Sequence, residues 1–141
     1  YSVSLTVTDN AGATHTKTAS VTVAAPGPQV YSNGADYAIK DLTTVESPIA
    51  VIGRNGNAPT AAKVIIAIEH SFRGDLRVDL VAPDGSVYLI KNYNTTDSAD
   101  DVRGTATLNL SSEALSGTWK LRVRDNYVND IGKIDSWSIE F

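Results

Sequence analysis

Aspartate is the residue type in this sequence whose number and placement could do chemistry. Twelve of the 16 acidic side chains are Asp and only four are Glu. Asp favours turns and is unfavourable inside strands, so most of these carboxylates should lie in loops, where calcium sites are built from oxygen ligands. Taken singly, each Asp is better explained as a turn former. The group as a whole raises the hypothesis of a calcium site.

Nucleophilic and zinc chemistry lack suitable residues. The chain has no Cys and only two histidines, His15 and His70, whereas a zinc site needs a Cys or His cluster. Neither a Gly-x-Ser-x-Gly nor a His-Glu-x-x-His motif occurs. We expect His15 in a solvated hairpin turn, His70 at the end of the buried face of a strand, and no catalytic residue. Arg73-Gly74-Asp75 also spells an integrin-binding tripeptide, which is common by chance.

Length and composition narrow the class of protein. The 141 residues suit one domain with a short additional fragment, and a hydrophobic content of 42% supports a real core. The net charge of −4 argues against nucleic-acid binding, which needs a basic face. No apolar run approaches 18 residues, so no membrane span is expected. Without Cys, a secreted protein often uses metal ions to stiffen its loops. Because Met is also absent, we expect Tyr1 to be a cut end with any signal peptide upstream.

The N-terminal residues predict a β-hairpin. Residues 1–8 and 16–24 alternate between apolar and polar side chains, and a turn sequence at 9–12 separates them. Two strands alone are marginally stable in water. The run Ala-Pro-Gly-Pro at 25–28 follows as a linker. We therefore expect a fragment at 1–24, the linker at 25–28 and the main domain at 29–141.

The main domain reads as an all-β sandwich. Short alternating runs recur with turn residues between them, and no convincing helix is present. The alternation places Trp119 and Trp137 in the core. The runs are 30–31, 37–39, 47–52, 61–70, 76–82, 87–90, 106–110, 119–123 and 136–141.

Strand geometry brings several acidic loops to one end of this domain. We assume that 61–70 and 76–82 form a hairpin and that 118–124 lies antiparallel beside 76–82. The loops at 71–75, 92–102 and 125–132 then meet. Close carboxylates repel one another unless a cation lies among them, and an oxygen-only ligand set suits Ca²⁺ best. No EF-hand pattern is present. The candidate metal ligands are Asp75, Asp97, Asp100, Asp101, Asp125 and Asp130.

Four stretches in this order resemble a known family. They are "HSFRGDLRVDLVAPDGSVYLI", "DSADDV", "SGTWKLRVRD" and "GKIDSWSIEF". Together they resemble the P domain, the C-terminal domain of proprotein convertases and of many secreted bacterial proteases, over roughly residues 29–141. The resemblance implies a jelly-roll β-sandwich that follows a catalytic domain, is not itself catalytic, and supports folding, stability and calcium dependence. Eukaryotic members usually carry cysteines, so the absence of Cys points to a bacterial source.

The N-terminal stretch resembles a second family. "YSVSLTVTDNAG" followed by "ASVTV" is similar to the last two strands of a polycystic-kidney-disease (PKD) domain, an extracellular immunoglobulin-like module. A PKD tail before a P domain implies a secreted, extracellular bacterial endopeptidase of serine or metallo type as the parent. Its catalytic domain is then the expected partner, and a protein substrate is a further candidate partner.

One alternative belongs to a different functional class. The chain could be a substrate-binding module for protein, such as collagen, or for polysaccharide, because jelly rolls bind sugars through exposed aromatic side chains. Tyr88, Tyr93 and Tyr127 are the candidate platform residues.

Overall fold

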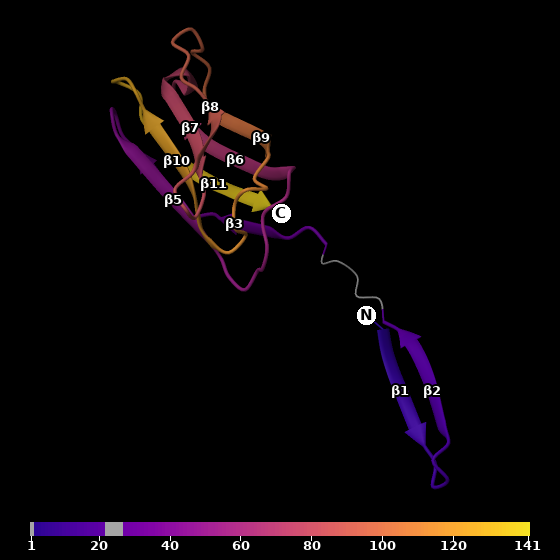
Figure 1. Cartoon of the computed structure of the whole chain (residues 1–141). Helices are drawn as coiled ribbons and strands as arrows, with labels where there is room; N and C mark the ends of the chain where they lie inside the picture. The colour runs from indigo at the N-terminus through magenta and orange to yellow at the C-terminus, as the bar shows by residue number, and fades with distance from the viewer. Residues whose placement is uncertain (1, 22–26) are drawn as a thin grey trace.

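The computed structural model describes residues 2–21 and 27–141, and these form three antiparallel β-sheets (Figure 1). The one helical element in these ranges is a single 3₁₀ turn, η1 (Arg73–Asp75). Tyr1, the last residues of the expected fragment and much of the expected linker lie outside the described residues. No helix within the described ranges is long and apolar enough to cross a membrane.

The first sheet is the predicted hairpin of β1 (Ser2–Thr8) and β2 (Thr14–Ser20). The Asp9 carboxylate accepts the backbone N–H groups of the turn, and Gly12 takes a left-handed φ of 84°. Every residue of both strands is exposed. The expectation for His15 was wrong in one respect. It is solvated, but it lies in β2 opposite Val7, because the turn already closes when the N–H of Asp9 donates to the carbonyl of Ala13.

The other two sheets face each other as a sandwich (Figure 1). One has the strand order β5-β10-β7-β8, and the other has the order β3-β11-β6-β9 with β4 also paired to β11. The four-stranded sheet is made of β5 (Thr44–Val51), β7 (Leu76–Val81), β8 (Val87–Lys91) and β10 (Gly117–Asp125). The five-stranded sheet is made of β3 (Val30–Asn33), β4 (Tyr37–Ile39), β6 (Ala62–His70), β9 (Val102–Leu108) and β11 (Gly132–Glu140).

The core lies between these two sheets and follows the predicted alternation. On β6 the buried residues are every second one, ending with His70. Trp119 and Trp137 are buried as expected, and each indole N–H has a partner: Trp119 donates to the Leu115 carbonyl at 3.1 Å and Trp137 to the Ser47 hydroxyl at 3.0 Å. The all-β sandwich predicted from the sequence is thus confirmed.

One predicted strand pairing was wrong. Segments 61–70 and 76–82 do not form a hairpin, because β6 and β7 belong to opposite sheets and η1 carries the chain between them. The pairing of 118–124 with 76–82 was right, since β10 runs antiparallel to β7 from Lys120 to Asp125. Although the chain passes from one sheet to the other at 71–75, this loop still lies at the predicted end of the sandwich, together with the other acidic loops.

Candidate functional site

The three loops at 71–75, 92–102 and 125–132 do meet at one end of the sandwich, and we call this end the acidic pole. The second loop is bound to the first, since the N–H of Arg73 donates to Ala99 and the N–H of Asn94 donates to Gly74. The third loop is bound to the first through the N–H of Asn126, which donates to the Asp75 carbonyl at 3.1 Å. Backbone hydrogen bonds therefore hold all three loops together.

Gly74 is required by close packing at this pole. A methyl group on Gly74 would overlap the carbonyl oxygens of Asn94 and Asp97, so only glycine lets the loop 92–102 lie against η1. Gly74 and Asp75 are both buried. The Arg-Gly-Asp tripeptide is therefore part of the packing of the pole and is not presented as an exposed recognition loop.

A buried histidine–aspartate pair lies beneath the pole. The Nε2 of His70 is 3.2 Å from Oδ2 of Asp125, and both side chains are fully buried. Nδ1 of His70 contacts the backbone of Phe72, and Oδ1 of Asp125 accepts the N–H of Tyr127 at 2.9 Å. His70 was predicted to be buried. Both of its ring nitrogens are engaged, so it is not available as an exposed general base.

Asp75 is a buried carboxylate without a hydrogen-bond donor. It is 6% exposed, and its carboxylate accepts no hydrogen bond from the residues that the structure describes. Burial raises the pKa of Asp75, and the nearby charges of Asp125 and Asp130 raise it further. The carboxylate of Asp130 accepts the Ser71 hydroxyl at 2.8 Å. Asp75, Asp125 and Asp130 thus lie close enough to repel one another, and a bound cation would reduce this repulsion.

The other three predicted aspartates lie in the loop 92–102 and have different surroundings. Asp97 pairs with Nε of Arg73 at 2.9 Å, and this hydrogen bond holds the pKa of Asp97 below its usual value. Asp101 accepts the N–H of His70 at 3.1 Å, and Arg103 lies 3.4 Å from its other oxygen. Asp100 is exposed beside a shallow hollow that Asp101 also lines. The six aspartates therefore divide into two groups.

Lys91 already places one cation at the pole, and sequence reasoning missed it. Its ammonium donates to the carbonyl oxygens of Arg73, Leu76 and Asn92 at 2.6, 3.2 and 3.2 Å. Burial lowers the pKa of Lys91, while the charges of Asp97 and Asp75 act in the opposite direction. No sequence signal marks this residue, because a Lys at the end of a strand usually extends into solvent.

Asp41 is a second residue that the sequence did not indicate. Its Oδ2 accepts the N–H of Asn129 at 3.0 Å, whereas its Oδ1 is buried with no hydrogen-bond partner in the described structure. Within residues 2–21 and 27–141, no group of three or more His, Asp or Glu side chains is placed to hold a metal ion. The donor chemistry nevertheless fits Ca²⁺, which prefers oxygen ligands. The buried Oδ1 of Asp41 lacks a hydrogen-bond partner, and the carboxylate of Asp75 accepts no hydrogen bond within the described residues.

The candidate aromatic platform is not flat. Tyr93 and Tyr127 are exposed at the pole, but their rings meet edge to face, with centroids 6.3 Å apart and planes inclined by 67°. Tyr88 lies elsewhere, and its hydroxyl donates to Glu113. A sugar ring stacks on a face that is open and planar. The three tyrosines therefore do not form one flat platform, and the substrate-binding alternative stays a prediction.

The fold and these motifs agree with comparisons to known proteins. The family model described as "Proprotein convertase P-domain" matches residues 59–141. The chain belongs to the P-domain family. P domains are non-catalytic accessory domains of proteases. The family resemblance seen in the sequence is confirmed, whereas the PKD assignment of the hairpin stays a prediction.

Relatives of this P domain are bacterial proteases. The transglutaminase-activating metalloprotease of Streptomyces mobaraensis is 45% identical over 141 residues, which are 99% of this chain and 18% of that protein. The calcium-dependent protease of Nostoc sp. is 33% identical over 120 residues, which are 79% of this chain and 18% of that protein. The P domain chain therefore spans about a fifth of the length of these relatives.

A solved structure shows the same fold. The serine protease of Aeromonas sobria superposes with a TM-score of 0.62 at 15% identity, over 97% of this chain and 36% of that one. At this level of identity the likeness concerns the fold alone. It agrees with the two-sheet sandwich described above.

Proposed function

We propose that this chain is the accessory P domain of a secreted, extracellular bacterial protease and that its partner is the catalytic domain of the same protein. The observation that carries the proposal is the state of His70. It is the one histidine of residues 29–141, and it is fully buried with both ring nitrogens engaged. A hydrolase needs an accessible base, nucleophile or metal, so the catalytic residues belong to another part of the parent protein.

The parent protease is a serine or a metallo endopeptidase. One relative reported above is named a metalloprotease, which supports the metallo type, and the serine type stays the alternative. In either case the role of the P domain is to support folding and stability of the catalytic domain. Contact with a protein substrate is a further role of the same domain.

We further propose that calcium binds at the acidic pole. Asp75 and Asp130 would hold the ion together with the unpaired Oδ1 of Asp41. Asp125, whose two oxygens already contact His70 and the N–H of Tyr127, would add its negative charge. Asp97, Asp100 and Asp101 are the remaining candidates, but Asp97 already faces Arg73 and Asp101 already faces Arg103. Bound calcium would supply the positive charge that offsets the repulsion around Asp75. The name of the Nostoc relative, a calcium-dependent protease, supports this proposal.

A deletion experiment tests the accessory role. The full-length parent protein is produced with and without residues 29–141, and secreted yield and the half-life of proteolytic activity at elevated temperature are measured. We expect the deletion to reduce both, and the isolated 141-residue chain to leave casein uncut. Two results would contradict the proposal: an unchanged half-life after deletion, or casein cleavage by the isolated chain that disappears in the variant His70→Ala.

A further inference from the structure

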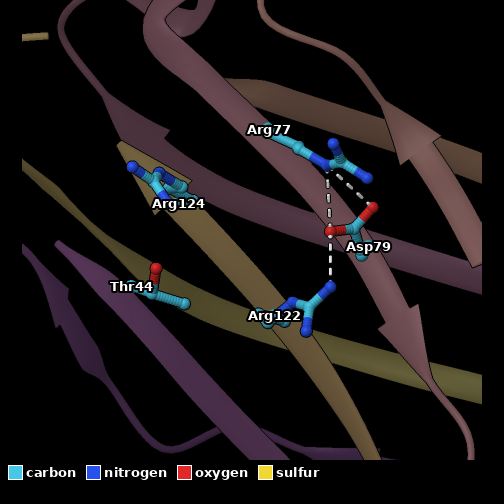
Figure 2. Close-up of a pocket in the computed structure, with 5 residues that line it drawn as sticks. All are labelled: Thr44, Arg77, Asp79, Arg122 and Arg124. Atoms are coloured by element: carbon cyan, nitrogen blue, oxygen red, sulfur yellow. Dashed lines mark hydrogen bonds and ion pairs between the residues drawn. The ribbon is translucent and has the colours of Figure 1, made fainter. Parts of the chain in front are cut away.

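The outer face of the sheet β5-β10-β7-β8 carries a cluster of three arginines that the calcium proposal does not use. Arg77 comes from β7, and Arg122 and Arg124 come from β10. With Thr44 and Asp79 they line a recess of about 350 Å³ (Figure 2). We call these three side chains the arginine cluster.

One carboxylate, that of Asp79, pairs with two of the three guanidinium groups. The Nε of Arg77 donates to both oxygens of Asp79 at 3.1 and 3.2 Å, and Arg122 donates to Oδ2 at 3.0 Å. Figure 2 shows these two side chains reaching Asp79 from opposite sides, while no interaction line reaches Arg124. The side chain of Arg124 has no hydrogen-bond or ion-pair partner among residues 2–21 and 27–141. The recess therefore has a net positive charge on a chain whose net charge is −4.

The register makes this arrangement unfavourable in the absence of a ligand. Arg124 of β10 lies directly opposite Arg77 of β7, and Thr44 of β5 lies on its other side. Like charges directly opposite on antiparallel strands are destabilising. An anion between the two guanidinium groups would convert this repulsion into charge-assisted hydrogen bonds, which are shorter and stronger than neutral ones.

Apolar side chains adjoin the cluster on the same face. Leu89 of β8 lies directly opposite Asp79, and Val87 lies opposite Val81 two residues further along β7. Leu89 and Val87 are 50% and 45% exposed. A free phosphate or a sulfated glycan makes no use of such neighbours. A polypeptide, by contrast, offers acidic and apolar side chains on one segment.

We propose that the arginine cluster is a docking site for an acidic polypeptide segment. One carboxylate of the segment enters the recess between Arg77 and Arg124, and a neighbouring apolar side chain packs on Val87 and Leu89. If the segment belongs to the parent protease, tethering raises its effective concentration at the site. Only this tethering effect rests on the proposed function. Recognition of the carboxylate does not depend on it.

The test uses the 141-residue chain and synthetic peptides. The probe is the capped peptide acetyl-Gly-Leu-Glu-Val-Glu-Gly-amide, and its control has Gln at both Glu positions. Binding is followed by ¹H–¹⁵N NMR of backbone amides and arginine Nε–H groups. We expect the acidic peptide to shift signals of the arginine cluster and of β8, to bind at least tenfold more tightly than the Gln peptide, and to weaken steeply with added salt.

Matched variants separate the site from a general charge effect. Arg124→Gln should weaken binding at least fivefold, and it should fold normally because the replaced side chain is exposed and unpaired. Arg103→Gln on β9 removes the same charge from the opposite sheet and should leave binding unchanged. Equal affinity for both peptides, equal loss in both variants, or tighter binding of inorganic phosphate or a heparin fragment than of the acidic peptide would overturn the proposal.

Discussion

The imidazole of His70 and the carboxylate of Asp125 form a fully buried pair that joins the two layers of the sandwich. His70 ends β6 in one sheet and Asp125 ends β10 in the other, and Nε2 and Oδ2 are 3.2 Å apart. A buried polar group without its partner is costly. The pair therefore stabilises the relative position of the two sheets directly beneath the acidic pole.

Removal of one member of this pair should destabilise the fold. We expect Asp125→Ala to lower the free energy of unfolding by on the order of 3 kcal/mol, because His70 then loses its buried acceptor. Asp125→Asn should cost less, since it keeps an acceptor oxygen. Asp36→Ala is the control. It breaks an exposed ion pair with Lys133 and should cost at most about 0.5 kcal/mol. Urea denaturation measures all three, and equal midpoints would disprove the structural role.

Two glycines in the strands on either side of β6 give a second prediction. A methyl group at Gly132 of β11 would overlap the carbonyl oxygen of Glu69, whereas at Gly104 of β9 it would meet no atom within 4 Å. Gly132→Ala should therefore destabilise the protein by about 1–3 kcal/mol or more, and Gly104→Ala should be nearly neutral. Thermal denaturation of the two variants provides the comparison. A neutral Gly132→Ala would show that β11 can move away from β6.

The sequence predicted the strands better than their partners. Apolar and polar residues alternate along β10 and from Leu76 to Leu80 on β7, so residues such as Val78 and Leu121 were placed in the core correctly. Strand pairing was harder to predict, because the sequence of a strand does not show whether the next strand in the chain lies beside it or in the opposite sheet. The boundaries of β11 were also missed. Its first half is interrupted by an irregularity between Ile134 and Ser136, which breaks the two-residue period.

The candidate site was predictable only as a region. Loop positions followed from strand directions, and these brought Asp75 and Asp130 into one neighbourhood. The partner of each carboxylate did not follow, because Arg73 reaches Asp97 through side-chain conformations that a sequence does not reveal. Asp41 was missed for a related reason. It lies in a turn distant in sequence and meets Asn129 only after folding.

The cross-strand arginines predict a gain of stability on removal of one charge. Arg124→Gln should raise the free energy of unfolding by a few tenths of a kcal/mol at low salt, because it relieves the repulsion with Arg77. The difference should fade as salt is added. Arg103→Gln should have the opposite sign, since Arg103 lies close to Glu69 and Asp101. A loss of stability in Arg124→Gln would mean that the cluster is structural.

The N-terminal hairpin should be dispensable for the sandwich. All residues of β1 and β2 are exposed, and the P-domain match begins at residue 59. We expect a chain of residues 29–141 to unfold at the same urea concentration as the full chain. The truncation begins at Gln29 because its backbone exchanges two hydrogen bonds of 3.0 Å with Phe141. A lowered midpoint would show that the boundary lies further upstream.

The ionisation of Asp75 predicts how stability depends on pH without calcium. Its pKa is raised in the folded state, mainly by burial and then by Asp125 and Asp130. The folded protein therefore binds this proton more tightly than the unfolded chain. Its contribution to stability is complete below the ordinary Asp pKa of about 3.9 and is lost as the pH rises through the raised value. In a chelator, Asp75→Asn should be more stable than the parent chain at pH 7, and the difference should vanish in acid.

Calcium should reverse the order of stability of the parent chain and Asp75→Asn. An ion that binds the folded state adds about 2.7 kcal/mol at a hundredfold excess over Kd, which should raise the Tm by several degrees, with Mg²⁺ less effective because it keeps its waters. Asp75→Asn and Asp130→Ala should lose most of this gain. Asp84→Ala, at a turn where its carboxylate accepts the N–H of Ser86, should keep it. Asp75→Asn would thus be the more stable protein in chelator and the less stable one in calcium. Coincident melting curves in excess calcium and in chelator would contradict the calcium proposal and leave Asp75 as an ordinary buried turn residue.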